Sequence, residues 1–82
     1  MDTRTYSGID QKRAADLLAL SHDHGAEITG DGRFGTISEY GVRLEYEYDS
    51  ANEKLTLGII HKPLLIPSGK VFSEIEKATG LK

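Results

Sequence analysis

Residues 42–49 read VRLEYEYD, and residues 54–61 read KLTLGIIH. In both stretches large apolar residues alternate with polar or small ones, which is typical of a β-strand with one buried face and one exposed face. The polar segment DSANE at residues 49–53 joins them. The pattern predicts an antiparallel hairpin in a sheet whose one face is apolar and whose other face is largely charged.

Helical patterns lie on either side of this hairpin. Apolar or small residues at positions 14, 17, 18 and 21 form one stripe, so we expect a helix that begins near Ile9–Asp10, is capped by Asp10 or Ser7, and ends at Gly25. A second helix is predicted over residues 69–79, with Ser68 as its cap and Gly80 at its end. Leu81 then packs back against that helix.

Weaker strand signals fill the space between the first helix and the hairpin. Residues 26–29 and 33–40 are strand candidates, and Gly41 permits a bend before the hairpin. We therefore predict an α+β fold of α-β-β-β-α order, in which an antiparallel sheet of three to four strands carries both helices on one face. The expected core is Leu17, Leu18, Ile28, Val42, Leu44, Tyr46, Leu55, Leu57, Ile59, Val71, Phe72 and Ile75.

Length and composition limit the class of protein. The 82 residues predict a single domain over residues 1–82, with residues 1–8 loosely ordered, and the absence of cysteine excludes disulfides and thiolate metal sites. The net charge of −3 disfavours nucleic acid as a partner. No apolar run approaches the roughly 20 residues that span a bilayer, and the N-terminus lacks an apolar signal core. We expect a cytoplasmic protein without a membrane partner.

Two short motifs resemble phosphate-binding loops. Residues 30–35, GDGRFG, match G-x-G-x-x-G, but the following TISEY reads as a strand, whereas a dinucleotide site requires a helix there. The segment Ser68-Gly69-Lys70 lacks the upstream glycine and the hydroxyl residue after the lysine. We interpret the first motif as a hairpin turn and the second as the start of a helix.

The histidines are the only candidates for metal ligands. His22 and His24 are two residues apart, and such residues diverge on a helix, so their spacing is poor for a shared ion. His61 falls on the apolar face of its strand by alternation. We predict no metal or cofactor site and keep these three histidines as weak candidates.

The segment PLLIP at residues 63–67 is the most useful hint of function. Its aliphatic residues either close the core or form an exposed patch that meets another chain. We predict a small non-catalytic binding or self-associating module, in which Ile60, Leu64, Leu65 and Ile66 form the interface of a homodimer or meet another protein. A small-ligand or metal-binding protein that uses the histidines is the alternative, and nucleic-acid binding comes third.

Overall fold

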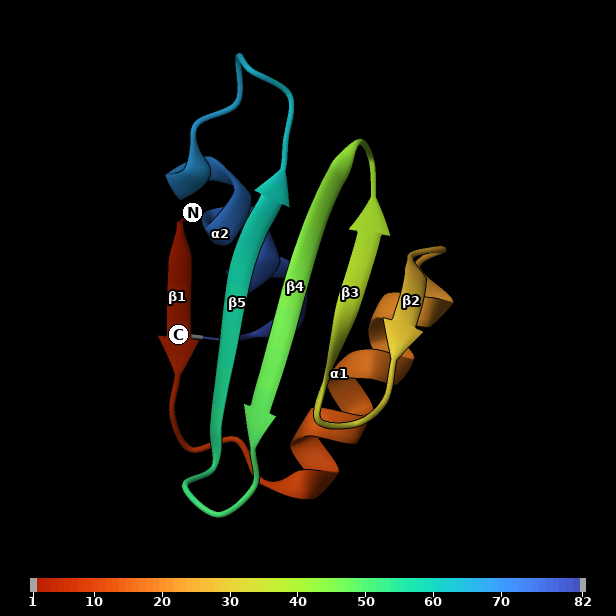
Figure 1. Ribbon diagram of the computed structural model, residues 1–82, viewed down its shortest axis with the longest axis vertical. Coiled ribbons are helices and arrows are strands. Elements are labelled where there is room, and N and C mark those ends of the chain that lie inside the picture. The colour runs from red at the N-terminus through yellow and green to blue at the C-terminus, as the bar shows by residue number, and fades with distance from the viewer. Residues whose placement is uncertain (1, 82) are drawn as a thin grey trace.

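The structure is a computed structural model that describes residues 2–81. Its five strands form one antiparallel sheet in the order β1-β5-β4-β3-β2 (Figure 1). The predicted α+β class is confirmed, but the sheet has five strands rather than three or four, and a strand precedes the first helix. The elements are β1 (Thr3–Tyr6), α1 (Gln11–Asp23), β2 (Glu27–Gly30), β3 (Phe34–Glu39), β4 (Val42–Asp49), β5 (Lys54–His61) and α2 (Ser68–Thr79).

The hairpin of β4 and β5 lies at the centre of the sheet, as its two sides are extended by β3 and by β1. Tyr46 pairs with Leu57, and Leu44 pairs with Ile59, so the large side chains share one face. All four of these side chains are buried. The predicted hairpin and the predicted buried face are both confirmed.

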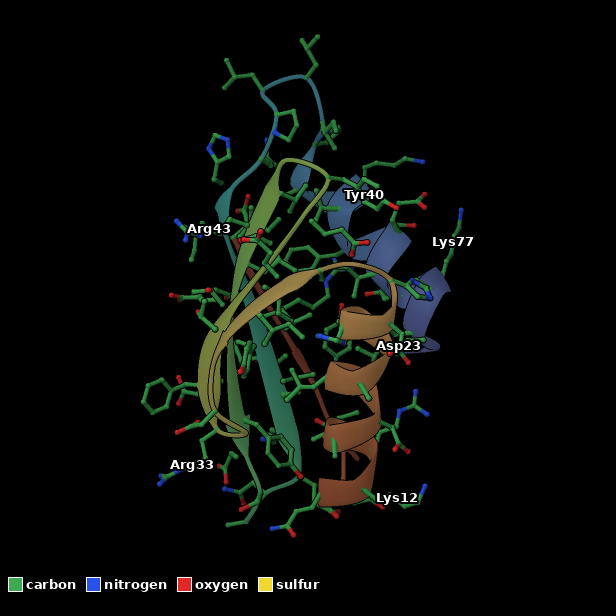
Figure 2. The ribbon with its side chains drawn as sticks, turned by 90° about the vertical axis from the view of Figure 1, so that its right-hand side faces the viewer. Lys12, Asp23, Arg33, Tyr40, Arg43 and Lys77 are labelled. Atoms are coloured by element: carbon green, nitrogen blue, oxygen red, sulfur yellow. The ribbon has the colours of Figure 1, made fainter. Side chains whose placement is uncertain are left out.

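Both helices cover this apolar face, and the other face of the sheet is left without a helix (Figure 2). α1 lies behind β2 and β3, and α2 lies behind β5 and β1 (Figure 1). The carboxylate of Asp10 caps α1 by accepting a hydrogen bond of 2.8 Å from the Arg13 amide. Gly80 ends α2 in the left-handed conformation, and Leu81 is buried behind it, as predicted.

The N-terminal segment corrects the sequence analysis. Residues 3–6 belong to the segment expected to be loosely ordered, yet they form β1 and pair with β5 along the sheet edge. Tyr6 is the most buried large side chain of the described residues, at 1% exposure. Its hydroxyl donates a hydrogen bond of 2.9 Å to Glu76, which also accepts one of 2.8 Å from Arg4. These side-chain bonds join the edge strand to α2.

The core differs from its predicted membership in a systematic way. Four residues outside the expected list are buried: Tyr6, Ile9, Ala26 and Leu81. Five expected core residues are only half-buried and pack at its margin: Leu17, Leu18, Ile28, Val42 and Ile75. All of these five except Ile28 line the space between the two helices. The side chains of this chain leave that space unfilled.

A β-bulge near the end of β5 reverses one predicted orientation. Leu44 pairs with Ile59, but Arg43 pairs with His61, so Ile60 is an extra residue on β5. Residues directly opposite each other share a face, and His61 therefore lies on the outer face with Arg43. The expectation that His61 lies on the apolar face was wrong because alternation was counted through the bulge.

The two faces of β5 predict different costs of truncation. Leu57→Ala removes a side chain that is 4% exposed, and we expect it to lower the free energy of unfolding by about 2–5 kcal/mol. Thr56→Ala, on the outer face, removes a methyl group and a hydroxyl that bonds to Thr5 at 2.9 Å, and we expect a loss below about 1 kcal/mol. Urea denaturation of both variants measures the difference. A larger loss for Thr56→Ala would show that the faces are assigned the wrong way round.

Tyr6 predicts a loss of stability at alkaline pH. Burial, together with the hydrogen bond to Glu76, raises the pKa of Tyr6 to about 12. Because the folded chain keeps this proton at a pH where the unfolded chain loses it, the stabilisation is complete below about pH 10 and is lost as the pH rises towards 12. Denaturant unfolding at a series of alkaline pH values should show this decline, with a shallower decline in Tyr6→Phe. Equal slopes in the two proteins would exclude Tyr6 as its source.

Candidate functional site

One hollow of the described residues is a groove between α1 and α2, here called the interhelical groove. Its volume is about 500 Å³, within the range of roughly 300–1,000 Å³ typical of small-molecule sites. The floor is the apolar face of the sheet, and each helix supplies one wall. The floor includes Ile37, Val42, Leu44, Tyr46 and Leu57, and the walls include Ala14, Leu17, Leu18, Val71, Ile75 and Ala78.

The two ends of the interhelical groove differ. At one end Arg13 donates a hydrogen bond of 3.1 Å to the carbonyl oxygen of Thr79, which ties the start of α1 to the end of α2. The opposite end is lined by Ile66, Tyr40 and the first turns of α2. Tyr40 lies beside α2 in the β3–β4 turn (Figure 2). The groove is therefore bridged at one end and bordered by a turn and a loop at the other.

Three hydroxyl groups that line the groove donate to backbone carbonyls of the protein itself. Tyr46 donates to the carbonyl of Asp31 at 2.5 Å, and Tyr48 donates to the carbonyl of Ile9 at 2.7 Å. Ser21 donates to Leu17 within α1 at 3.0 Å. A molecule in the groove therefore meets hydrocarbon and aromatic surface along the walls and floor.

Ionisable side chains lie along the groove margin. His24, Glu39, Lys70 and Glu74 are among the lining residues, and Lys70 pairs with Glu74 at 3.0 Å. Burial raises the pKa of Tyr46 and of Tyr48, so both phenols stay protonated at neutral pH. This direction is unfavourable for either phenol as a general base.

The candidate histidines do not come together. His22 lies in the last turn of α1, His24 lies at the margin of the groove, and His61 lies on the outer face of the sheet. The sheet thus separates His61 from the other two. Among residues 2–81, no three histidine or carboxylate side chains are grouped closely enough to hold a metal ion.

The G-x-G-x-x-G segment forms the hairpin turn between β2 and β3, as predicted. Gly30 pairs with Gly35, and a strand follows instead of a helix. The carboxylate of Asp31 accepts hydrogen bonds from the amides of Arg33 and Phe34 at 2.8 and 3.1 Å. Amides that would cradle a phosphate are thus used by a side chain of the turn.

The second resembling motif is a helix start, also as predicted. Ser68, Gly69 and Lys70 form the first turn of α2, but the N-cap is Pro67 and not Ser68. The Ser68 hydroxyl donates to the carboxylate of Asp2 instead. The expected cap was wrong because the helix begins one residue earlier than its sequence signal.

The four candidate interface residues lie in three different places. Ile60 is the bulge residue of β5 and is 47% exposed, whereas Leu64 and Leu65 are in the β5–α2 loop at 96% exposure each. Ile66 is half-buried at the end of the interhelical groove. Self-association through these residues stays a prediction.

Comparison with known proteins gives no relative. No protein-family model matches the sequence, and no curated protein or solved structure matches it either. Within residues 2–81, neither helix is long and apolar enough to cross a lipid bilayer. The argument for function therefore depends on the geometry alone.

A substitution at Gly35 tests how closely the groove floor packs against the β2–β3 turn. An added Cβ would lie 2.7 Å from the Tyr46 hydroxyl and even closer to the carbonyl oxygen of Thr29, so Gly35→Ala should lower the free energy of unfolding by about 1–3 kcal/mol. Gly32→Ala is the control, since a Cβ at Gly32 meets no atom within 4 Å. Urea denaturation compares them, and equal stabilities would refute the close fit.

Proposed function

We propose that this chain is a small non-catalytic binding module whose interhelical groove holds an elongated apolar ligand, such as the hydrocarbon chain of a fatty acid. The observation that carries the proposal is a groove of about 500 Å³ whose floor and walls are mostly apolar. Apolar surface in such a groove favours a ligand because its burial removes it from water.

The chemistry of the groove supports a hydrocarbon ligand over a polar one. A polar ligand is held by convergent hydrogen-bonding groups, whereas Tyr46, Tyr48 and Ser21 already donate to backbone carbonyls. Ionisable side chains lie at the margin, where Glu39, Lys70, Glu74 and His24 are among the lining residues. A carboxylate head group at this margin would stay in water while the chain lies along the floor.

A fluorescent fatty acid whose emission rises in apolar surroundings tests the proposal. We expect saturable binding, and we expect Ala78→Phe to weaken it by about tenfold or more, because a phenyl ring on that wall occupies the space of the ligand. Ala78 is exposed on α2, so the larger side chain does not displace the core.

Ala19→Phe is the matched control, since Ala19 is an exposed residue of α1 outside the groove lining. It should bind the probe as the parent protein does. Either the absence of saturable binding by the parent protein or unchanged binding by Ala78→Phe would reject the groove as the site.

A further inference from the structure

The loop between β5 and α2, residues 62–67, forms one extreme of the long axis of the molecule (Figure 1). Its amide at Ile66 donates a hydrogen bond of 3.1 Å to the carbonyl of Pro63, which closes a tight turn. Leu64 and Leu65 are the two central residues of this turn, and each is 96% exposed. We propose that this loop is a docking tip that inserts into the surface of a lipid bilayer.

The two leucines contribute almost nothing to the fold that displays them. The turn is anchored by the half-buried Ile66 and bounded by Pro63 and Pro67, so it has little freedom to fold the leucines back. Adjacent aliphatic side chains in a fixed, fully exposed turn are unusual for a surface that meets only water. Their position favours a partner that accepts hydrocarbon.

Tyr40 extends the apolar tip from a neighbouring turn. It is 88% exposed, and its φ of 52° lies in the left-handed region, which is unfavourable for a bulky residue. The Tyr40–Gly41 turn approaches the loop, since a Cβ at Gly41 would lie 3.8 Å from the ring of Pro63. A tyrosine beside aliphatic residues suits the head-group level of a bilayer, where the ring is buried and the hydroxyl is hydrated.

Basic groups follow directly behind the apolar tip. The chain from Lys54 to Ser73 contains no acidic residue, although the protein as a whole is acidic. Lys62 adjoins the turn, and Arg43 lies on the outer side of the sheet at the same end (Figure 2). Lysine and arginine behind an inserted apolar segment are placed to meet lipid phosphates.

The acidic groups at the end of the molecule that carries the β5–α2 loop are hydrogen-bonded, ion-paired or face the groove. Asp2 accepts the hydrogen bond of Ser68, Glu74 pairs with Lys70 and Lys77, and Glu39 lines the interhelical groove. The resulting tip is apolar at its apex with cations set behind it, which complements a bilayer with anionic lipids.

A protein partner fits the tip less well than a bilayer does. Leu64 and Leu65 are two adjacent side chains at the apex of the loop, whereas a standard protein interface buries about 800 Å² on each partner. A bilayer requires no matching shape, because each inserted side chain leaves water independently. A surface of this kind also requires no spanning segment, so the sequence criterion for membrane proteins does not detect it.

Co-sedimentation with vesicles tests the proposal. We expect the protein to bind vesicles of phosphatidylcholine mixed with phosphatidylglycerol, and the double variant Leu64→Ser, Leu65→Ser to bind at least about tenfold more weakly. Far-UV circular dichroism should be unchanged, since both side chains are exposed. Phe34→Ser is the matched control. Phe34 is 62% exposed but lies at the opposite end of β3 from Tyr40, so this variant should bind vesicles as the parent protein does.

Further variants separate the tip from the other surfaces. Lys62→Gln with Arg43→Gln should weaken binding to the anionic vesicles and leave binding to pure phosphatidylcholine unchanged. Ala78→Phe should bind vesicles as the parent does, so failure of the groove and failure of the tip are distinguishable. Absence of vesicle binding by the parent, or equal binding by the double leucine variant, would overturn the proposal. A dimer seen by light scattering that the double variant abolishes, without vesicle binding, would assign the tip to self-association instead.

Discussion

The pairing of β4 with β5 is the interaction on which the other elements of this molecule depend. β3 extends the sheet from one side of this pair, and β1 extends it from the other. The buried side chains Leu44, Tyr46, Leu55, Leu57 and Ile59 all come from these two strands, so the pair also supplies most of the surface that the helices cover. Each helix covers a different half of that surface, and the interhelical groove is the region between them.

The groove and the rest of the core show how polar groups are managed in a small domain. Each buried hydroxyl near the groove donates to a backbone carbonyl, and no side-chain nitrogen or oxygen that is buried within residues 2–81 lacks a partner. A buried polar atom without a partner would lower the stability of the fold, and an unpaired one in the groove would favour a polar ligand. The pairing of these polar atoms leaves apolar contact as the main interaction that the groove offers.

Sequence periodicity was sufficient to predict the hairpin and both helices, because each has a long, regular pattern of apolar residues. It failed for β1, whose four residues include one large apolar side chain, and whose partner strand is about fifty residues away along the chain. It also failed at His61, because alternation does not reveal the extra residue of a bulge.

The candidate sites were harder to predict for a related reason. An apolar stripe on a helix shows which face turns inward, but not how far two helices lie apart, so the groove had no signal of its own. The PLLIP segment was ambiguous because both a core plug and an exposed patch are rich in leucine. The hydrogen bond from Ile66 to Pro63 resolves the local geometry, since it fixes which residues occupy the apex of the turn.

The outermost strands, β1 and β2, are only four residues long, while the central strands β4 and β5 have eight. A long, flat edge would offer a row of free amides and carbonyls on which the strand of another chain could grow. Here the sheet tapers towards both sides, so few such groups are available for strand addition. The taper disfavours polymerisation through the sheet and leaves contacts with other molecules to side chains.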